Sequence, residues 1–403
     1  MFNKNFFFQN TNIAKKDLKK NTATTKQFFD LLKFDIQNFE LPLLTSFEKS
    51  YEFDFSINTI KKFSKYKNII IIGMGGSILG TKSIYSFFKK KIKKNVFFFD
   101  NLDPNLQSAY KKIKKIQNSC FIVVSKSGTT LEVLTNFFTI FSKNLLKNKL
   151  IVITEKRSSP LTELGNKLKA EIIEHKDFIG GRYSVLSEVG MLPSALMGLK
   201  IKDFKNLDKL LKNKYFVSSL IHNVAYIYTL SSKGVKNSVL LSYDAKLNDL
   251  CHWYQQLTAE SLGKKSKGIT PIVSYVPKDH HSLLQLFLDG PKDKFFTFFN
   301  SEEKFVKYKV PKNNLSKGTE FLKNKSLESI IKAQSDAAQK VFKLKKIPFR
   351  KIIFKKNDEQ ELGSCFTFLV LETILLGRLM KINPFDQPAV EDVKVETKKI
   401  ISK

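Results

Sequence analysis

A chain of 403 residues can bury a large hydrophobic core and is expected to divide into two domains. Its formal net charge of +32 could attract nucleic acid, but the Lys and Arg residues are scattered along the whole chain and not gathered in a stripe interleaved with aromatic residues, which disfavours a nucleic-acid partner. Three widely spaced cysteines exclude a cysteine-based metal site and, with a start that lacks the apolar core of a signal peptide, indicate a reducing, cytoplasmic location.

Residues 1–45 are polar, contain helical pieces and carry no motif, which predicts an N-terminal arm. Beyond them, short runs that are wholly apolar alternate with segments of helical length. This alternation is typical of parallel strands covered by helices on both faces of the sheet. It predicts a first α/β domain over residues 46–205, with strands at 68–72, 96–99, 121–124, 150–153 and 171–174.

A second series of the same kind follows a helical stretch around residues 205–232 and predicts a second α/β domain over residues 206–380. The apolar stretch 362–382 contains charged residues, so it is expected to be a buried helix and not a membrane span. Residues 381–403 form a C-terminal segment. The expected fold is therefore two three-layer α/β/α sandwich domains with mainly parallel sheets, plus N-terminal and C-terminal helical arms. The strands of the second domain are expected at residues 237–241, 272–275, 295–299 and 349–354.

The loop after the first strand, Gly73–Gly80, reads Gly-Met-Gly-Gly-Ser-Ile-Leu-Gly. It resembles a dinucleotide fingerprint, but that spacing requires a glycine where the chain has Ile78. It is not a Walker loop either, because no Gly-Lys-Ser or Gly-Lys-Thr closes it. The loop predicts a tight turn where the backbone approaches a ligand closely, or a turn needed only for packing.

The loop after the third strand, Ser125–Thr130, reads Ser-Lys-Ser-Gly-Thr-Thr and leads into a helical pattern. Its hydroxyls and backbone N–H groups are expected at a helix N-terminus, where the helix dipole favours an anion. The pattern indicates a phosphate site, although Ser and Thr are also ordinary helix caps.

Three further motifs place polar residues at turns. Arg182 follows two glycines and suits a phosphate or a developing oxyanion, whereas a lone Arg more often forms a surface ion pair. Glu260 stands near the end of a helical stretch, where a Glu is usually solvated. His280 and His281 open a helix but lack the nearby ligands of a metal site.

These segments, together with the turn and helix start at Asn383–Lys394 and in their order along the chain, resemble the signature segments of the glucose-6-phosphate isomerase family, in its shorter bacterial branch. The most specific matches are Gly-Gly-Arg-Tyr-Ser-Val-Leu-Ser at 180–187 and Asn-Pro-Phe-Asp-Gln-Pro at 383–388. The resemblance implies a sugar isomerase fold and reversible isomerisation of glucose 6-phosphate and fructose 6-phosphate in glycolysis and gluconeogenesis. The reaction opens the sugar ring, passes through a cis-enediol and needs no metal or organic cofactor.

The resemblance also implies roles for individual residues. Glu260 matches the base that carries a proton between C2 and C1, a task suited to a partly desolvated carboxylate. His281 matches the acid–base residue of ring opening, and Lys394 matches the Lys that assists at the ring oxygen. Arg182 matches the Arg beside the enediolate. Contacts with the substrate or its phosphate are implied for Gly76, Ser77, Ser125, Lys126, Ser127, Thr130, Gln256 and Gln387.

In this family the catalytic His comes from the neighbouring subunit, so the resemblance implies a homodimer with shared active sites. The chain departs from the family at Ala389, where a Gly is common next to the helix that carries Lys394. If that Gly has φ > 0, Ala389 is expected to strain the turn.

Other functions remain open from the residues alone. A sugar-phosphate sensor on the same fold would keep Ser125–Thr130 but would have no use for Glu260, His281 and Lys394 together. An NAD-dependent oxidoreductase is disfavoured by the incomplete glycine fingerprint. A nucleic-acid binder driven by charge would show a steep salt dependence.

Overall fold

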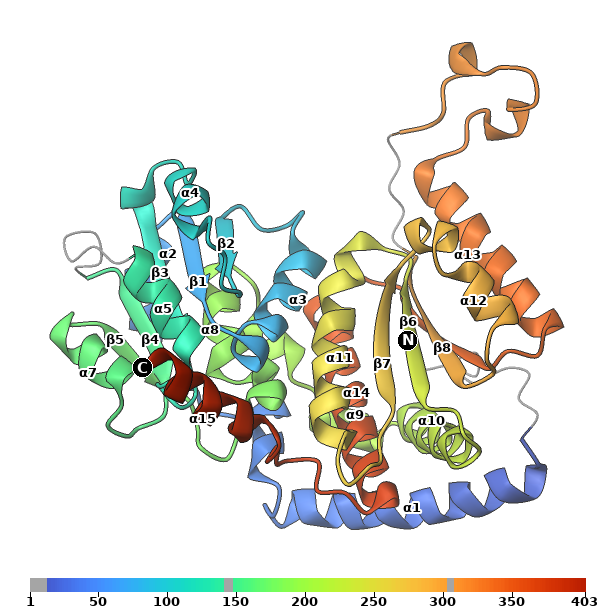
Figure 1. The fold of residues 1–403 in the computed structure, drawn as a ribbon, viewed down its shortest axis with the longest axis horizontal. Helices are drawn as coiled ribbons and strands as arrows, with labels where there is room; N and C mark the ends of the chain where they lie inside the picture. Colours follow the sequence, from blue (N-terminus) through green and yellow to red (C-terminus); the bar gives the residue numbers. More distant parts are fainter. Residues whose placement is uncertain (1–12, 141–147, 303–307) are drawn as a thin grey trace.

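The computed structural model describes residues 13–140, 148–302 and 308–403 (Figure 1). Residues 1–12 of the expected N-terminal arm lie outside this part of the chain. Within it, two parallel sheets stand side by side, each with helices on both faces, so the expected pair of α/β/α sandwiches is confirmed.

The strands coincide with the apolar runs of the sequence. The first sheet contains β1 (Asn68–Ile72), β2 (Asn95–Phe99), β3 (Ser119–Val124), β4 (Leu150–Thr154) and β5 (Glu171–Glu174), and the second contains β6 (Asn237–Ser242), β7 (Thr270–Tyr275), β8 (Lys294–Ser301) and β9 (Phe349–Phe354).

Helices connect the strands and form both ends of the described chain. They are α1 (Lys15–Gln37), α2 (Ile57–Ser64), α3 (Leu79–Phe88), α4 (Leu106–Lys111), α5 (Leu131–Ile140), α7 (Pro160–Lys167), α8 (Glu188–Leu196), α9 (Leu207–Lys212), α10 (Lys214–Ser232), α11 (Asn248–Leu262), α12 (Leu284–Asp289), α13 (Leu327–Leu344), α14 (Glu359–Met380) and α15 (Val390–Ile401).

The strand orders place a topological reversal at the centre of each sheet. They are β2-β1-β3-β4-β5 and β7-β6-β8-β9, so the order reverses between β1 and β3 and between β6 and β8. Ligands of such sheets bind at the reversal, beyond the carboxyl ends of the strands. Ile72, the last residue of β1, is in register with Val123 of β3, so the loops that follow these strands leave the sheet side by side.

Side chains alternate along each strand, and the alternation divides the interior into three cores. Ile69 and Ile71 of β1 face a central core between the two sheets, whereas Ile70 and Ile72 face an outer core beneath α4, α5 and α7. Residues of α3, α8, α10, α11 and α14 all contribute to the central core. This shared core packs the two sandwiches firmly against each other.

The ends of the chain form the expected helical arms. α1 lies along α10, and Asn21 Nδ2 donates to Thr229 Oγ1 over 2.8 Å. α15 lies across the first sandwich and none of its residues is buried (Figure 1). In the described chain α14 alone is long and apolar enough to span a bilayer, and 94% of its apolar window is buried, which confirms the expected buried helix.

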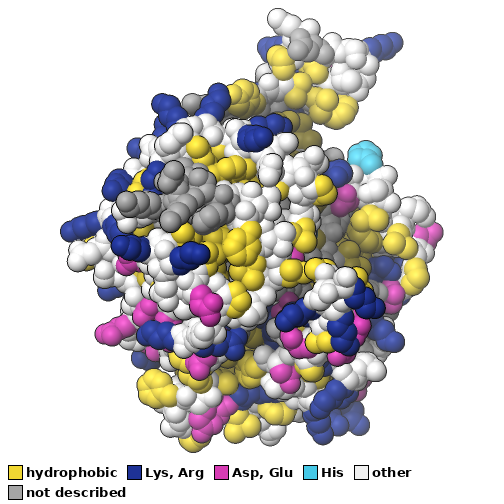
Figure 2. All heavy atoms as spheres, turned by 60° about the vertical axis from the view of Figure 1, so that its left-hand side comes forward, with side chains coloured by type: hydrophobic (Ala, Val, Ile, Leu, Met, Phe, Trp, Pro, Cys, Tyr) yellow, Lys and Arg dark blue, Asp and Glu magenta, His cyan; other side chains and the backbone are white. Residues whose placement is uncertain are grey.

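Basic side chains are spread over the surface. On the face shown in Figure 2, Lys and Arg side chains lie at many separate places, with Asp and Glu side chains between them. The face therefore lacks the continuous basic stripe that a nucleic-acid backbone requires.

Candidate active site

Gly76 brings the loop after β1 against the loop that carries Arg182. The turn η3 (Gly75–Ser77) packs on η5 (Gly181–Leu186), and Ser184 Oγ donates to the carbonyl oxygen of Gly76 over 3.3 Å. A Cβ on Gly76 would lie 2.2 Å from the backbone carbon of Gly181, so only glycine fits at this position.

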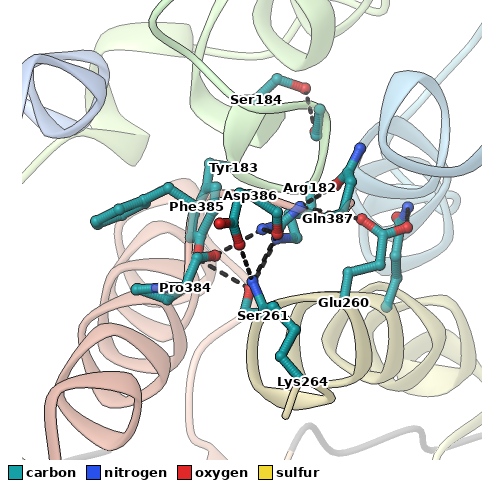
Figure 3. Close-up of polar contacts among 12 residues, drawn as sticks. Arg182, Tyr183, Ser184, Glu260, Ser261, Lys264, Pro384, Phe385, Asp386 and Gln387 are labelled. Carbon is teal, nitrogen blue, oxygen red and sulfur yellow. Dashed lines mark hydrogen bonds and ion pairs between the residues drawn. The ribbon is translucent and has the colours of Figure 1, made fainter. Parts of the chain in front are cut away.

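Arg182 lies at the centre of the candidate site and is buried (Figure 3). Its guanidinium is held by groups from α11 and from the segment 383–387. Each of the five N–H donors of the guanidinium has an acceptor in the protein. Nε donates to Ser261 Oγ at 2.7 Å, Nη1 to Glu260 Oε2 at 3.3 Å and to Gln387 Oε1, and Nη2 to the carbonyl oxygens of Pro384 at 2.6 Å and Asp386 at 3.1 Å.

Glu260 lies in the last turn of α11 and keeps 30% of its side chain exposed. Its Oε1 accepts a 2.8 Å bond from Nε2 of Gln256, one helical turn earlier, and its Oε2 accepts from Arg182. The buried Oε1 of Gln256 has no hydrogen-bond partner among the described residues. The cluster therefore combines a half-open carboxylate, a buried guanidinium and a buried amide oxygen that has no hydrogen-bond partner among the described residues.

The hydroxyl turn, Ser125–Thr130, is folded by its own side chains. Ser125 Oγ accepts from the backbone N–H of Gly128 at 3.1 Å and lies 2.8 Å from Thr130 Oγ1. Ser127 Oγ accepts from the backbone N–H of Thr129 at 3.3 Å. The turn leads directly into α5, so it stands at a helix N-terminus at the reversal point of the first sheet, as predicted.

Lys126 and Ser77 lie next to the reversal point but engage different groups. Lys126 Nζ donates to the carbonyl oxygen of Asp177 over 2.6 Å and lies 3.8 Å from Glu155 Oε1. Burial lowers the pKa of Lys126, although the nearby carboxylates oppose the shift. Ser77 is half-buried in η3, on the neighbouring loop. Ser77 therefore lies on the loop that follows the strand next to β3, whereas the ammonium of Lys126, within the hydroxyl turn, is engaged by Asp177 and Glu155.

His281 does not lie beside Glu260 in the same chain. α11 runs antiparallel to β7, because His252 near its start contacts the hydroxyl of Tyr275 at the end of β7, and Gln255 donates to Pro271 near the start of β7. Glu260 lies further along α11, beyond the start of β7. His281 lies beyond the other end of β7, in η8 (Lys278–His281), and is exposed. Eight residues of α11 separate His252 from Glu260, about 12 Å at 1.5 Å per residue, so Glu260 and His281 lie toward opposite ends of β7.

Lys394 pairs with a residue of its own helix and not with Glu260 or Arg182. It is on α15, where its Nζ contacts Glu391 Oε1 at 2.6 Å and both side chains are 63% exposed. Ala389, just before α15, has φ −65° in the right-handed helical region. The strain expected at Ala389 is therefore not observed, because its backbone does not need φ > 0.

Several residues of the site were not predicted. Tyr183 OH lies 2.9 Å from Ser261 Oγ and donates to the carbonyl oxygen of Pro384 at 2.9 Å. Lys264 contacts Asn383 and Asp386. The only sequence signal for these residues was their position inside the motifs that contain Arg182, Glu260 and Gln387.

Comparisons with known proteins show the family of the chain. The family profile described as Phosphoglucose isomerase matches residues 56–403. The chain is 32% identical over 356 residues to glucose-6-phosphate isomerase of Methanocaldococcus jannaschii, covering 85% of this chain and 86% of that protein. It is 34% identical over 375 residues to the glucose-6-phosphate isomerase of Mycoplasmopsis pulmonis, covering 87% of each.

Solved structures share the fold. A hypothetical protein from Thermus thermophilus matches with a TM-score of 0.80 at 22% identity, covering 97% of this chain and 100% of that one. A glucose-6-phosphate isomerase from Chlamydia trachomatis matches with a TM-score of 0.71 at 21% identity, covering 86% of this chain and 72% of that one. At these identities the two structures support the architecture of paired sandwiches.

Proposed function

This chain belongs to the phosphoglucose isomerase family, and we propose how its residues carry out the family's reaction. The reaction is the reversible isomerisation of glucose 6-phosphate and fructose 6-phosphate, which serves glycolysis and gluconeogenesis. Opening the ring exposes a carbonyl, and one proton then moves between C2 and C1 through a cis-enediol. The chain has to supply a base for that proton, a stabiliser for the enediolate charge and an anchor for the phosphate.

The observation that carries the proposal is the contact between Glu260 and Arg182 in a half-open site. Glu260 is the proposed base, because its carboxylate can accept the proton from one carbon and return it to the other. Arg182 is the proposed stabiliser of the enediolate oxygen. Its Nη1 donates to side chains, Glu260 and Gln387, which a substrate oxygen can replace, while Ser261 and two backbone carbonyls hold the other nitrogens.

We infer that the 6-phosphate binds at the hydroxyl turn. Backbone N–H groups, hydroxyls and the N-terminus of α5 converge there, Lys126 belongs to the turn, and Ser77 lies on the loop after the neighbouring strand β1. The contact of Gly76 with the Arg182 loop joins the phosphate end of the site to the reacting end. Binding energy from the phosphate then fixes C1 and C2 against Glu260, with Gln256 and Gln387 as contacts to substrate hydroxyls.

Ring opening is the proposed task of His281 and Lys394. His281 is exposed and lies toward the opposite end of β7 from Glu260 of its own chain, which supports a homodimer in which the partner subunit supplies this imidazole. Lys394 is the proposed group at the ring oxygen. Its exposed ion pair with Glu391 contributes little free energy, so Lys394 can exchange it for a contact with the substrate.

The organisation of the chain follows the same proposal. We propose that residues 46–205 and 206–380 are the two α/β domains and that the enzyme is cytoplasmic. Two observations support this: the two separate sheets, and the burial of α14.

A coupled assay that starts from fructose 6-phosphate tests the function and the base together. The wild-type chain should isomerise it, and Glu260→Gln should lower kcat by about 10²- to 10⁴-fold while the substrate still binds. Glu163→Gln, an exposed carboxylate on α7, is the control and should keep the wild-type rate. A Glu260→Gln variant with a near-normal rate would contradict the assignment of the base.

A further inference from the structure

Lys264 follows the end of α11 and reaches the C-terminal turn, defined here as Asn383–Gln387. Its Nζ donates to the carbonyl oxygen of Asn383 at 2.5 Å, to that of Asp386 at 2.6 Å and to Oδ1 of Asp386 at 2.8 Å. An ammonium has three N–H donors, so every one of them is used on this turn. Only 12% of the Lys264 side chain is exposed, whereas its partner Asp386 is 51% exposed, so the contact is buried on the lysine side and open to solvent on the side of the carboxylate.

The C-terminal turn also accepts hydrogen bonds from the guanidinium of Arg182. The carbonyl oxygen of Asp386 accepts from both Lys264 and Arg182, and the next residue, Gln387, accepts from Nη1 of Arg182 (Figure 3). Within the turn, Asn383 Nδ2 donates to Asp386 Oδ2 over 3.0 Å. Lys264 therefore contacts the same carbonyl as Arg182 but none of the groups that face the half-open carboxylate of Glu260.

We propose that Lys264 is a positioning residue of the isomerase: it holds the C-terminal turn so that Gln387 and the Nη1 group of Arg182 stay next to Glu260. The proposal rests on the proposed roles of Arg182 and Glu260. Lys264 itself touches no reacting atom. The lowered pKa of Asp386, caused mainly by its hydrogen bond to Lys264, agrees with a charge-assisted contact.

The two ends of the site should respond differently to loss of Lys264. The phosphate is held at the hydroxyl turn, in the first sandwich, so ground-state binding of the substrate depends little on the C-terminal turn. Stabilisation of the enediolate depends on where Arg182 Nη1 lies, and a small displacement of a catalytic group costs rate more than affinity. A positioning role therefore predicts a fall in kcat with a nearly constant KM.

The test is Lys264→Met, which keeps the aliphatic stem and removes the three donors. We expect kcat to fall by about 10- to 100-fold and KM to change by less than about threefold. Lys267→Met is the matched control. Lys267 lies in the same loop as Lys264 but donates to the carbonyl oxygen of Met380, which precedes the C-terminal turn. The Lys267→Met variant should keep the wild-type kcat and KM.

Two further variants separate positioning from folding. Asp386→Asn keeps the two carbonyl contacts and should lose less kcat than Lys264→Met, and Lys264→Arg should recover part of the rate. Amide hydrogen exchange of residues 383–387 should be faster in Lys264→Met while the melting temperature of the whole protein stays close to that of the wild type.

Defined results would overturn the proposal. A wild-type kcat in Lys264→Met would do so, and so would equal losses in the Lys264→Met and Lys267→Met variants. An inactive wild-type chain would refute the proposed function instead, and unchanged hydrogen exchange of the turn would then still refute the positioning role.

Discussion

Arg182 joins three parts of the chain that are distant in sequence. A buried guanidinium is tolerated because each N–H has an acceptor, and removal of any acceptor leaves part of a buried cation unpaired. The bonds through Nε and Nη2 fix the plane of the group, and those through Nη1 keep it directed at Glu260 and Gln387. A Lys at this position has three donors on a flexible stem and could not reproduce this arrangement.

Gly76 is the residue at which the two loops of the site approach most closely. Gly76→Ala should destabilise the protein by about 1–3 kcal/mol or displace η5, because the new Cβ would lie 2.2 Å from the Gly181 backbone. Gly181→Ala is the control across the same contact, since its Cβ would meet Gly76 Cα at an ordinary 3.9 Å. Urea unfolding and kcat of both variants measure the difference, and equal behaviour of the two would contradict the close approach.

The hydroxyl turn is the element whose loss should affect binding before catalysis. Ser125→Ala and Thr130→Ala remove proposed phosphate contacts and should raise KM for fructose 6-phosphate by about tenfold each, the effect of about 1.4 kcal/mol of lost hydrogen bonding. Thr130→Ser keeps the hydroxyl and should stay near the wild-type KM. Initial rates over a range of fructose 6-phosphate concentrations measure KM for each variant. An unchanged KM in both Ala variants would show that the phosphate binds elsewhere.

Prediction from sequence succeeded for elements and failed for long-range contacts. The strands were predictable because wholly apolar runs such as Ile69–Ile72 fit only a sheet that is buried on both faces. The hydroxyl turn was predictable because it follows such a run. The contacts of Ser261 and Lys264 were not predictable, because their partners lie far away along the chain. A single Ser or Lys gives no sequence pattern that identifies a distant partner.

Lys205 ties Ser46, in the segment before β1, to η5, and its burial predicts a stability that depends on pH. Its buried Nζ donates to the carbonyl oxygens of Ser46 and Leu186 and lies 4.4 Å from the ring centroids of Tyr51 and Phe53. Burial lowers the pKa of Lys205 to about 7, and nearby Glu188 opposes the shift. In the unfolded chain a Lys has a pKa of about 10.4.

Between these pKa values the unfolded state binds the extra proton, so the free energy of unfolding should rise with pH. Relative to Lys205→Met, the wild-type chain should gain about 2 kcal/mol between pH 7 and pH 9. Urea unfolding of both proteins across this range measures the gain. Parallel pH profiles for the two proteins would show that Lys205 does not titrate in the folded state.

At the scale of the whole molecule, the proposed homodimer with shared active sites can be tested by mixing subunits. Glu260→Gln and His281→Ala should each be inactive as pure homodimers. Refolded together in equal amounts, they should recover about a quarter of the wild-type activity, because half of the dimers are mixed and each mixed dimer has one intact site. Glu260→Gln mixed with Arg182→Lys should recover nothing, since both residues belong to the same subunit's share of the site. No recovery in the first mixture would argue against a shared site.

The contacts of Arg182 come from three segments that are distant in sequence, and this predicts an order of events during folding. Ser261 and Pro384 are far from Arg182 along the chain, so their contacts close long loops and form slowly. Until they form, burial of the guanidinium is unfavourable, which keeps the loop that carries it open to solvent. The helices and sheets can therefore assemble before the site exists, and the recovery of catalysis during refolding should lag behind the recovery of secondary structure.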